Sequence, residues 1–218
     1  MPPTFPSQFI NENPMKKIAL LLVLFSAFSN ANDNISGFYL GAGLGATTFD
    51  DGGAFDYTGA SINADDSTLK FMGGYQFNRI VAVELQYTKY GDINVNHPTA
   101  KAVGFKGIDI ESTSISLAAN LGYTFDSGWR PFGIVGLGSL ESSTNVLGHS
   151  LSENNTSFHY GVGVEYAPKA LSGLAFRVAY EGDMFIEENV YQDYGHYSYS
   201  DDYAMNIGTF YAGATYKF

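Results

Sequence analysis

The chain has 218 residues, of which 11 are Lys or Arg and 22 are Asp or Glu, so its formal net charge is −11. This acidity argues against nucleic acid or an anionic membrane surface as a partner. The chain contains no cysteine, which excludes a disulfide framework and a thiolate metal site. Only 15% of its residues are charged, against roughly 25% in an ordinary globular protein, while 16% are aromatic.

The first segment with a clear pattern is MKKIALLLVLFSAFSNA, residues 15–31, which has the organisation of a secretory signal peptide. Lys16 and Lys17 precede an apolar run over 18–28, and a small-x-small cleavage site follows at 29–31. The alternatives are a buried helix or a short membrane anchor, but such a run rises only about 16 Å as a helix, against a hydrocarbon core of about 30 Å. We therefore expect export, with residues 1–14 as a non-native or disordered extension and 32–218 as the mature domain.

Eight segments of about ten residues follow, in which apolar and polar residues alternate. They cover residues 37–46, 68–77, 81–90, 114–125, 131–140, 157–166, 174–183 and 204–218. A period of two residues is typical of β-strands whose faces meet different environments. The fifth segment is apolar on both faces, so its register stays open.

The connections between these segments alternate in length. Three are short, at 78–80, 126–130 and 167–173, and four are long and polar, at 47–67, 91–113, 141–156 and 184–203. Short turns at one end and long loops at the other predict an antiparallel up-and-down meander of eight strands.

The polarity of the two faces indicates where this sheet lies. One face is apolar, with aromatic residues near the short turns: Phe38, Phe77, Tyr123, Trp129, Tyr166, Tyr216 and Phe218. The other face includes eleven polar side chains: Lys70, Gln76, Glu84, Gln86, Ser116, Asn120, His159, Glu165, Arg177, Glu181 and Lys217. A soluble barrel has the opposite polarity, with an apolar interior. The pattern predicts a transmembrane antiparallel β-barrel with lipid outside and hydrogen-bonded polar groups inside.

The signal peptide, the eight alternating strands, GYQFNRIVAVELQY around the first short turn and the terminal YAGATYKF together resemble the small outer-membrane β-barrel family, which includes the OmpA-type transmembrane domain and OmpX-like barrels. The resemblance covers essentially all of 32–218. It implies the outer membrane of a Gram-negative bacterium, with outer-membrane lipid and lipopolysaccharide as surroundings. It further implies that the barrel-assembly machinery reads Phe218 and Tyr216 as an insertion signal. A surface ligand is left open.

The charged side chains of the polar face form the candidate site. We expect a lumen cluster of Lys70, Glu84, His159, Glu165, Arg177 and Glu181. A diagonal ion pair between Glu165 and Arg177 is geometrically possible across neighbouring strands. Because an eight-stranded barrel has room only for side chains, the cluster is interpreted as a plug. The alternative is a gate, in which Arg177 exchanges carboxylate partners and opens a narrow path.

Other motifs favour structural explanations. GAGLGA fits a dinucleotide fingerprint at Gly41, Gly43 and Ala46, but no helix follows, so the glycines are read as small residues inside a narrow barrel.

His196 and Ser198 could imitate the His-x-Ser pair of a lipid A deacylase, yet these two residues lie in a long loop without fixed geometry. His159 is another candidate base. We therefore assign no catalytic residue, cofactor or metal.

The long loops are acidic. The fourth combines Asp183, Glu187, Glu188, Asp193, Asp201 and Asp202 with five tyrosines, and the first carries Asp50, Asp51, Asp56, Asp65 and Asp66. Such oxygen ligands could hold Ca²⁺ or Mg²⁺, but the spacing matches no EF-hand and surface solvation is the preferred explanation. Tyrosine mixed with Ser, Gly and Asp is typical of adaptable protein-binding loops. The sequence thus favours a structural, adhesive or surface-recognition role; a narrow pore is the alternative, and a lipid A-modifying enzyme a remote one.

Overall fold

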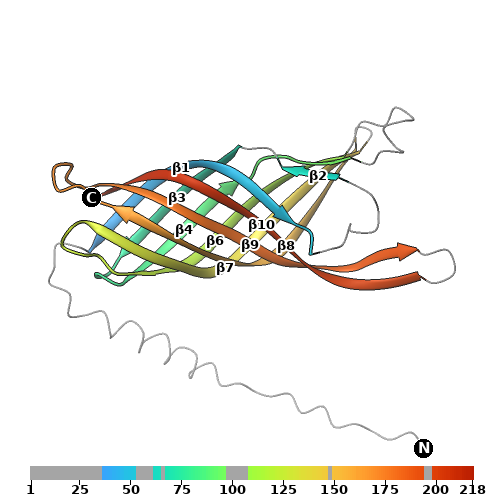
Figure 1. Cartoon of the computed structure of the whole chain (residues 1–218). Helices are drawn as coiled ribbons and strands as arrows, with labels where there is room; N and C mark the ends of the chain where they lie inside the picture. Colours follow the sequence, from blue (N-terminus) through green and yellow to red (C-terminus); the bar gives the residue numbers. More distant parts are fainter. Residues whose placement is uncertain (1–35, 53–60, 65–66, 97–107, 147–148, 194–197) are drawn as a thin grey trace, which may run out of the picture. The chain divides into compact units, whose positions relative to one another are not determined.

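Eight long antiparallel strands form a closed barrel in the computed structural model (Figure 1). The structure describes residues 36–52, 61–64, 67–96, 108–146, 149–193 and 198–218, so the predicted signal peptide lies outside it. The long strands are β1 (Gly37–Asp50), β3 (Thr68–Gln76), β4 (Val81–Lys89), β6 (Ile108–Gly122), β7 (Trp129–Val146), β8 (His149–Tyr166), β9 (Leu174–Asp193) and β10 (Ser198–Lys217). The barrel closes where β1 pairs with β10, from Tyr39↔Lys217 to Asp50↔Asn206. The predicted fold and its eight strands are confirmed.

No helix in these described ranges is long and apolar enough to cross a membrane.

Three short connections lie at one end of the barrel, which we call the turn end; the opposite end is called the loop end. Two of the turns contain a glycine with positive φ, Gly128 at 91° and Gly173 at 81°. Such a conformation is strained for any residue with a side chain. At Gly128 a Cβ would also lie 2.3 Å from the carbonyl oxygen of Ala167 in the next turn. Glycine is therefore required where these tight turns pack together.

At the loop end the strands extend further than the alternating pattern predicted. Segments 141–156 and 184–203 were expected to be loops, but β7 and β8 stay paired up to Val146↔His149, and β9 and β10 up to Asp193↔Ser198. Outside the membrane neither strand face needs an apolar surface, so the period-two signal disappears while backbone pairing continues. Figure 1 shows the β9–β10 hairpin, orange to red, reaching well beyond its neighbours.

The first two long connections contain two short strands of their own. They are β2 (Ser61–Ala64) and β5 (Ile93–Asn96), which pair with each other, and β5 also pairs with β6. Ile93 is buried in an apolar cluster inside the loop end, together with Tyr90, Leu140, Phe185, Met205 and Ile207. This apolar layer was not predicted from the sequence.

The outer face of the barrel is apolar, as predicted. Leu44, Leu117 and Val162 are 60–70% exposed in the isolated chain, a burial pattern that suits lipid and not water. The open register of the fifth segment is now fixed, since Phe132 and Ile134 are buried inside the barrel and Leu137 faces outward.

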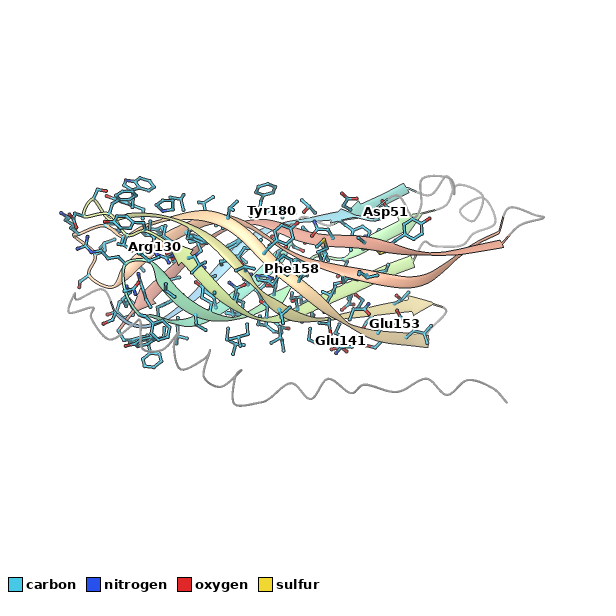
Figure 2. All side chains as sticks on the ribbon, turned by 90° about the horizontal axis from the view of Figure 1, so that it is seen from below. Asp51, Arg130, Glu141, Glu153, Phe158 and Tyr180 are labelled. Carbon is cyan, nitrogen blue, oxygen red and sulfur yellow. The ribbon has the colours of Figure 1, made fainter. Side chains whose placement is uncertain are left out.

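Aromatic side chains form two bands on this outer face. At the turn end the rings of Trp129 and Tyr166 lie 4.6 Å apart, and those of Tyr216 and Phe218 lie 5.2 Å apart. Nearer the loop end a chain of ring contacts links Phe158, Tyr160, Tyr180 and Phe210; Figure 2 labels Phe158 and Tyr180. Aromatic bands of this kind mark the two membrane interfaces of outer-membrane barrels.

The glycines of β1 make room for large side chains inside the barrel. A Cβ on Gly43 would lie 2.7 Å from Cδ2 of Tyr211, a buried ring on β10. The backbone of β1 can therefore approach the ring of Tyr211 only because Gly43 has no side chain. This arrangement fits the interpretation of the GAGLGA glycines as small residues inside a narrow barrel. β1 continues through the motif without a helix.

Candidate functional site

Arg177 is the centre of the candidate site and is almost fully buried, with 1% of its side chain exposed. It lies on an inward position of β9 and faces Glu165 of β8 and Glu84 of β4. Its Nη2 lies 2.7 Å from Oε1 of Glu84 and 2.8 Å from Oε1 of Glu165. The planar guanidinium also donates through Nη1 to Glu84 and through Nε to Glu165. One cation thus joins opposite walls of the barrel through two carboxylates.

The pair between Glu165 and Arg177 is more direct than the sequence indicated. The two residues are directly opposite in the β8–β9 register, not diagonal. Glu165 also accepts a hydrogen bond of 3.0 Å from Nη1 of Arg130, a residue that the sequence analysis placed in a turn. Arg130 lies toward the turn end, where Figure 2 labels it. Its guanidinium and that of Arg177 both lie over the ring of Phe132, at 5.7 and 4.7 Å from the ring centroid.

Glu84 is fully buried and has a complete set of donors. Besides Arg177, the hydroxyl of Tyr39 and the amide of Asn120 each donate to it at 2.6 Å, and the amide of Gln86 donates at 2.7 Å. A buried carboxylate needs such donors, because an unpaired charge in this position would be strongly destabilising.

A second group of charges lies one layer closer to the loop end. Nζ of Lys70 lies 2.8 Å from Oε2 of Glu181, and both side chains are fully buried. The hydroxyl of Tyr211 donates to the same carboxylate. Nη1 of Arg177 lies 4.0 Å from Oε1 of Glu181, so the two layers form one continuous network.

His159 extends this network toward the loop end. Its two ring nitrogens lie 3.1 Å from Asp183 and 3.4 Å from Glu181. Asp183 also accepts hydrogen bonds from Tyr90 at 2.7 Å and Ser157 at 2.8 Å. Asp183 was expected among the acidic residues of the fourth loop, and this prediction was wrong. β9 continues past residue 183, so the carboxylate keeps the inward parity of Arg177 and Glu181.

The structure thus brings together all six residues of the predicted lumen cluster, Lys70, Glu84, His159, Glu165, Arg177 and Glu181. Four further members of the network were not predicted from the sequence: Arg130, Asp183, Tyr39 and Tyr90. Parity alone identifies Tyr39, which alternates with exposed Phe38 and Leu40. Arg130 required the register of the fifth strand, and Tyr90 required the cross-barrel distance to Asp183.

Most of the remaining candidates lie outside the part of the chain that the structure describes. His196 lies outside the described residues, as does the side chain of Ser198, and the same holds for most acidic side chains of the first and fourth loops. His159 is fully buried, so it faces the lumen network and not the membrane surface. Within the described part of the chain, no group of three His, Cys, Asp or Glu side chains could hold a metal ion.

These features define an integral outer-membrane β-barrel of eight strands with a polar, side-chain-filled lumen. The chain matches the family model described as "Outer membrane protein beta-barrel domain" over residues 18–218, and it belongs to that family. Membership places it among proteins of the Gram-negative outer membrane.

Solved structures of other proteins share this fold. Neisserial surface protein A is 16% identical, with 84% of this chain and 98% of that chain covered and a TM-score of 0.58. OprG from Pseudomonas aeruginosa is 14% identical, with 87% and 99% covered and a TM-score of 0.55. Ail of Yersinia pestis is 19% identical, with 84% and 97% covered and a TM-score of 0.50. At these identities the likeness concerns the fold. A comparison with curated proteins found no match.

Proposed function

We propose that this barrel has a structural and surface-recognition role without catalysis, in which the lumen is a closed plug and the loop end carries the interaction. The observation behind the proposal is the lumen network, in which Lys70, Glu84, His159 and Glu181 are completely buried and Arg177 is nearly so. Side chains with no accessible surface leave no water-filled path beside them.

Opening such a plug has a large energetic cost. Arg177 contacts Glu84, Glu165 and Glu181, so an ion path through the barrel would separate several desolvated ion pairs. Removing one partner of a buried pair costs roughly 3–5 kcal/mol. Thermal fluctuations would therefore open the lumen only rarely, which favours the plug over the gate.

The loop end offers the contact surface. The β7–β8 and β9–β10 hairpins continue beyond the band of Phe158 and Tyr180, and they bear exposed apolar residues such as Leu151 and Ile186. We propose that the Tyr-rich acidic segment 184–203 forms the main part of this surface. Below it, the exposed apolar belt contacts outer-membrane lipid and lipopolysaccharide.

Single-channel recording tests the closed plug. The protein is refolded into a planar bilayer and compared with Arg177→Ala and with the control Lys89→Ala, whose pair with Glu111 is exposed and 3.9 Å long. We expect wild type and Lys89→Ala to be silent. Discrete openings in wild type that Arg177→Ala alters would contradict the plug and support a narrow pore.

A further inference from the structure

The barrel wall is split at the loop end between β8 and β9. Their ladder ends at Phe158↔Met184, although β8 continues back to His149 and β9 continues on to Asp193. Beyond this point β8 pairs with β7 and β9 pairs with β10, so two hairpins diverge. The split begins at Phe158, within the aromatic band nearer the loop end, and therefore at the level of a membrane interface.

A cleft of about 920 Å³ occupies this split. Its apolar lining includes outward-facing Phe158, Met184 and Ile186 as well as the inward-facing Phe185, while β8 adds a polar run from Glu153 to Ser157. Figure 2 labels Phe158 near the middle of the barrel and Glu153 nearer the loop end. The cleft therefore borders both the lipid-facing surface of the barrel and the interior of its loop end.

A smaller apolar cavity lies behind the cleft, inside the barrel mouth. Its volume is about 180 Å³, and Ile93, Leu140, Met205 and Ile207 contribute to its lining. The cavity and the cleft share Glu153, Asn155 and Phe185 as lining residues, so they adjoin each other. An apolar cavity of about 150 Å³ is known to stay dry and to hold benzene, so this one fits an apolar group of about six carbons.

The charge of the lining determines which molecules fit. Among the residues that line the cleft and the cavity, Glu153 alone is ionisable. Ser112, Ser142 and Thr144 add hydroxyl groups at one side of the cavity. An anionic head group would meet a carboxylate and no cation here, which is unfavourable, whereas a neutral or cationic head group finds acceptors.

We propose that this cavity is a binding site for small apolar molecules with a neutral or cationic polar end, which enter sideways between β8 and β9. The proposal is independent of the plug, because the site lies on the loop-end side of the charge network. Tyr90 lies at the boundary between the two. Its hydroxyl donates to Asp183 of the charge network, while its ring packs in the apolar cluster inside the loop end.

Methionine methyl NMR in nanodiscs tests the site directly. The described residues contain three methionines: Met205 lines the cavity, Met184 lines the cleft, and Met72 lies in a separate apolar cluster deeper in the barrel. Three six-carbon probes of equal chain length are titrated at pH 8: hexan-1-ol, hexylammonium and hexanoate. We expect hexanol and hexylammonium to shift Met205 saturably, hexanoate to bind at least about tenfold more weakly, and Met72 to stay unchanged.

Filling the cavity provides the matched comparison. Ser142 lines the cavity, whereas Ser143 is the next residue of β7 and has the opposite parity. Ser142→Phe is expected to abolish the shift of Met205, and Ser143→Phe is expected to preserve it. Thr144→Phe fills the same cavity from another position if Ser142→Phe refolds poorly, and heat-dependent gel migration verifies folding of each variant.

Three outcomes would overturn the proposal. The first is a silent Met205, with shifts at lipid-exposed Met184 alone, which indicates mere partition of the probes into the bilayer. The second is an unchanged Met205 response in both cavity-filling variants. The third is equal or tighter binding of hexanoate, which would refute the proposed charge preference.

Discussion

At the scale of single residues, each buried charge in the lumen depends for its stability on a partner of opposite charge. Glu84 and Arg177 are 93 positions apart in the chain, yet the guanidinium contacts both carboxylate oxygens inside the barrel. Because both side chains are buried, each charge depends on its partner for stability. The pair therefore differs in kind from an exposed pair such as Lys89–Glu111, which is expected to contribute less than about 1 kcal/mol.

A double-mutant cycle on this pair tests the interdependence. We expect Arg177→Met to lower the free energy of unfolding by roughly 3–5 kcal/mol, because it leaves the buried carboxylate of Glu84 without a cation. Glu84→Gln is expected to cost less, because Glu165 still pairs with Arg177. The double variant is expected to lose clearly less than the sum of the two. Urea titration of the protein in lipid vesicles measures these values, and the exposed pair Lys89–Glu111 is the control. Additive losses would show that Arg177 and Glu84 are not coupled.

At the scale of elements, the strands serve two purposes along their length. Between the aromatic bands every second residue faces lipid, and the ladders on both sides are continuous. Beyond the pair Phe158↔Met184 the backbone pairing of the β9–β10 hairpin is with itself alone, whereas β7 of the β7–β8 hairpin stays paired with β6 up to Asp109↔Asn145. Contacts within the outer β9–β10 hairpin contribute little to the closure of the barrel, so this hairpin is a separable part of the molecule.

Shortening the β9–β10 hairpin tests this separation. Replacing residues 188–201 with a two-residue turn leaves the pair Glu187↔Tyr203 and everything below it in place. We expect heat-dependent gel migration to be unchanged, while the adhesion to immobilised matrix proteins that the proposed surface role predicts for cells producing the wild type is lost in the variant. Shortening β7–β8 between 143 and 152 is the matched control, for which adhesion is expected to persist. Adhesion unaffected by the first variant would argue against the proposed contact surface.

At the scale of the whole molecule, the barrel closes between its first and last strands. β10 ends at Lys217, Phe218 donates a backbone hydrogen bond to Phe38, and the ring of Phe218 packs edge-on against Tyr216. The chain terminus therefore lies at the seam of the barrel and in the aromatic band of the turn end. This position agrees with the proposal that the assembly machinery recognises Phe218 and Tyr216.

Deleting Phe218 tests the insertion signal. We expect a marked fall in the amount of heat-modifiable protein in the outer membrane, while refolding of the purified variant into lipid is little affected. Phe125→Ala removes another exposed aromatic residue of the turn end and is the control, for which normal insertion is expected. Equal insertion of both variants would show that the terminal aromatic residue is not a recognition element.

The sequence by itself determined the class of fold, the eight strands and, outside the fifth segment and the strand ends, which residues face lipid and which face the lumen. The physical reason is that side-chain parity is a local property: Phe38 and Leu40 face outward and Tyr39 inward because successive residues of a strand point to opposite sides. The lumen cluster was predictable for the same reason, since polar residues on the inward parity have to meet inside a narrow barrel.

Tertiary structure alone decided which inward residues become partners. Glu84 reaches Arg177, and Tyr90 reaches Asp183, across the barrel, and these distances depend on the tilt and stagger of all the strands together. The same holds for the ends of the strands. Where neither face meets lipid, pairing leaves no alternating pattern, so the extension of β7 to β10, the burial of Asp183 and the split between β8 and β9 arise only from the folded chain.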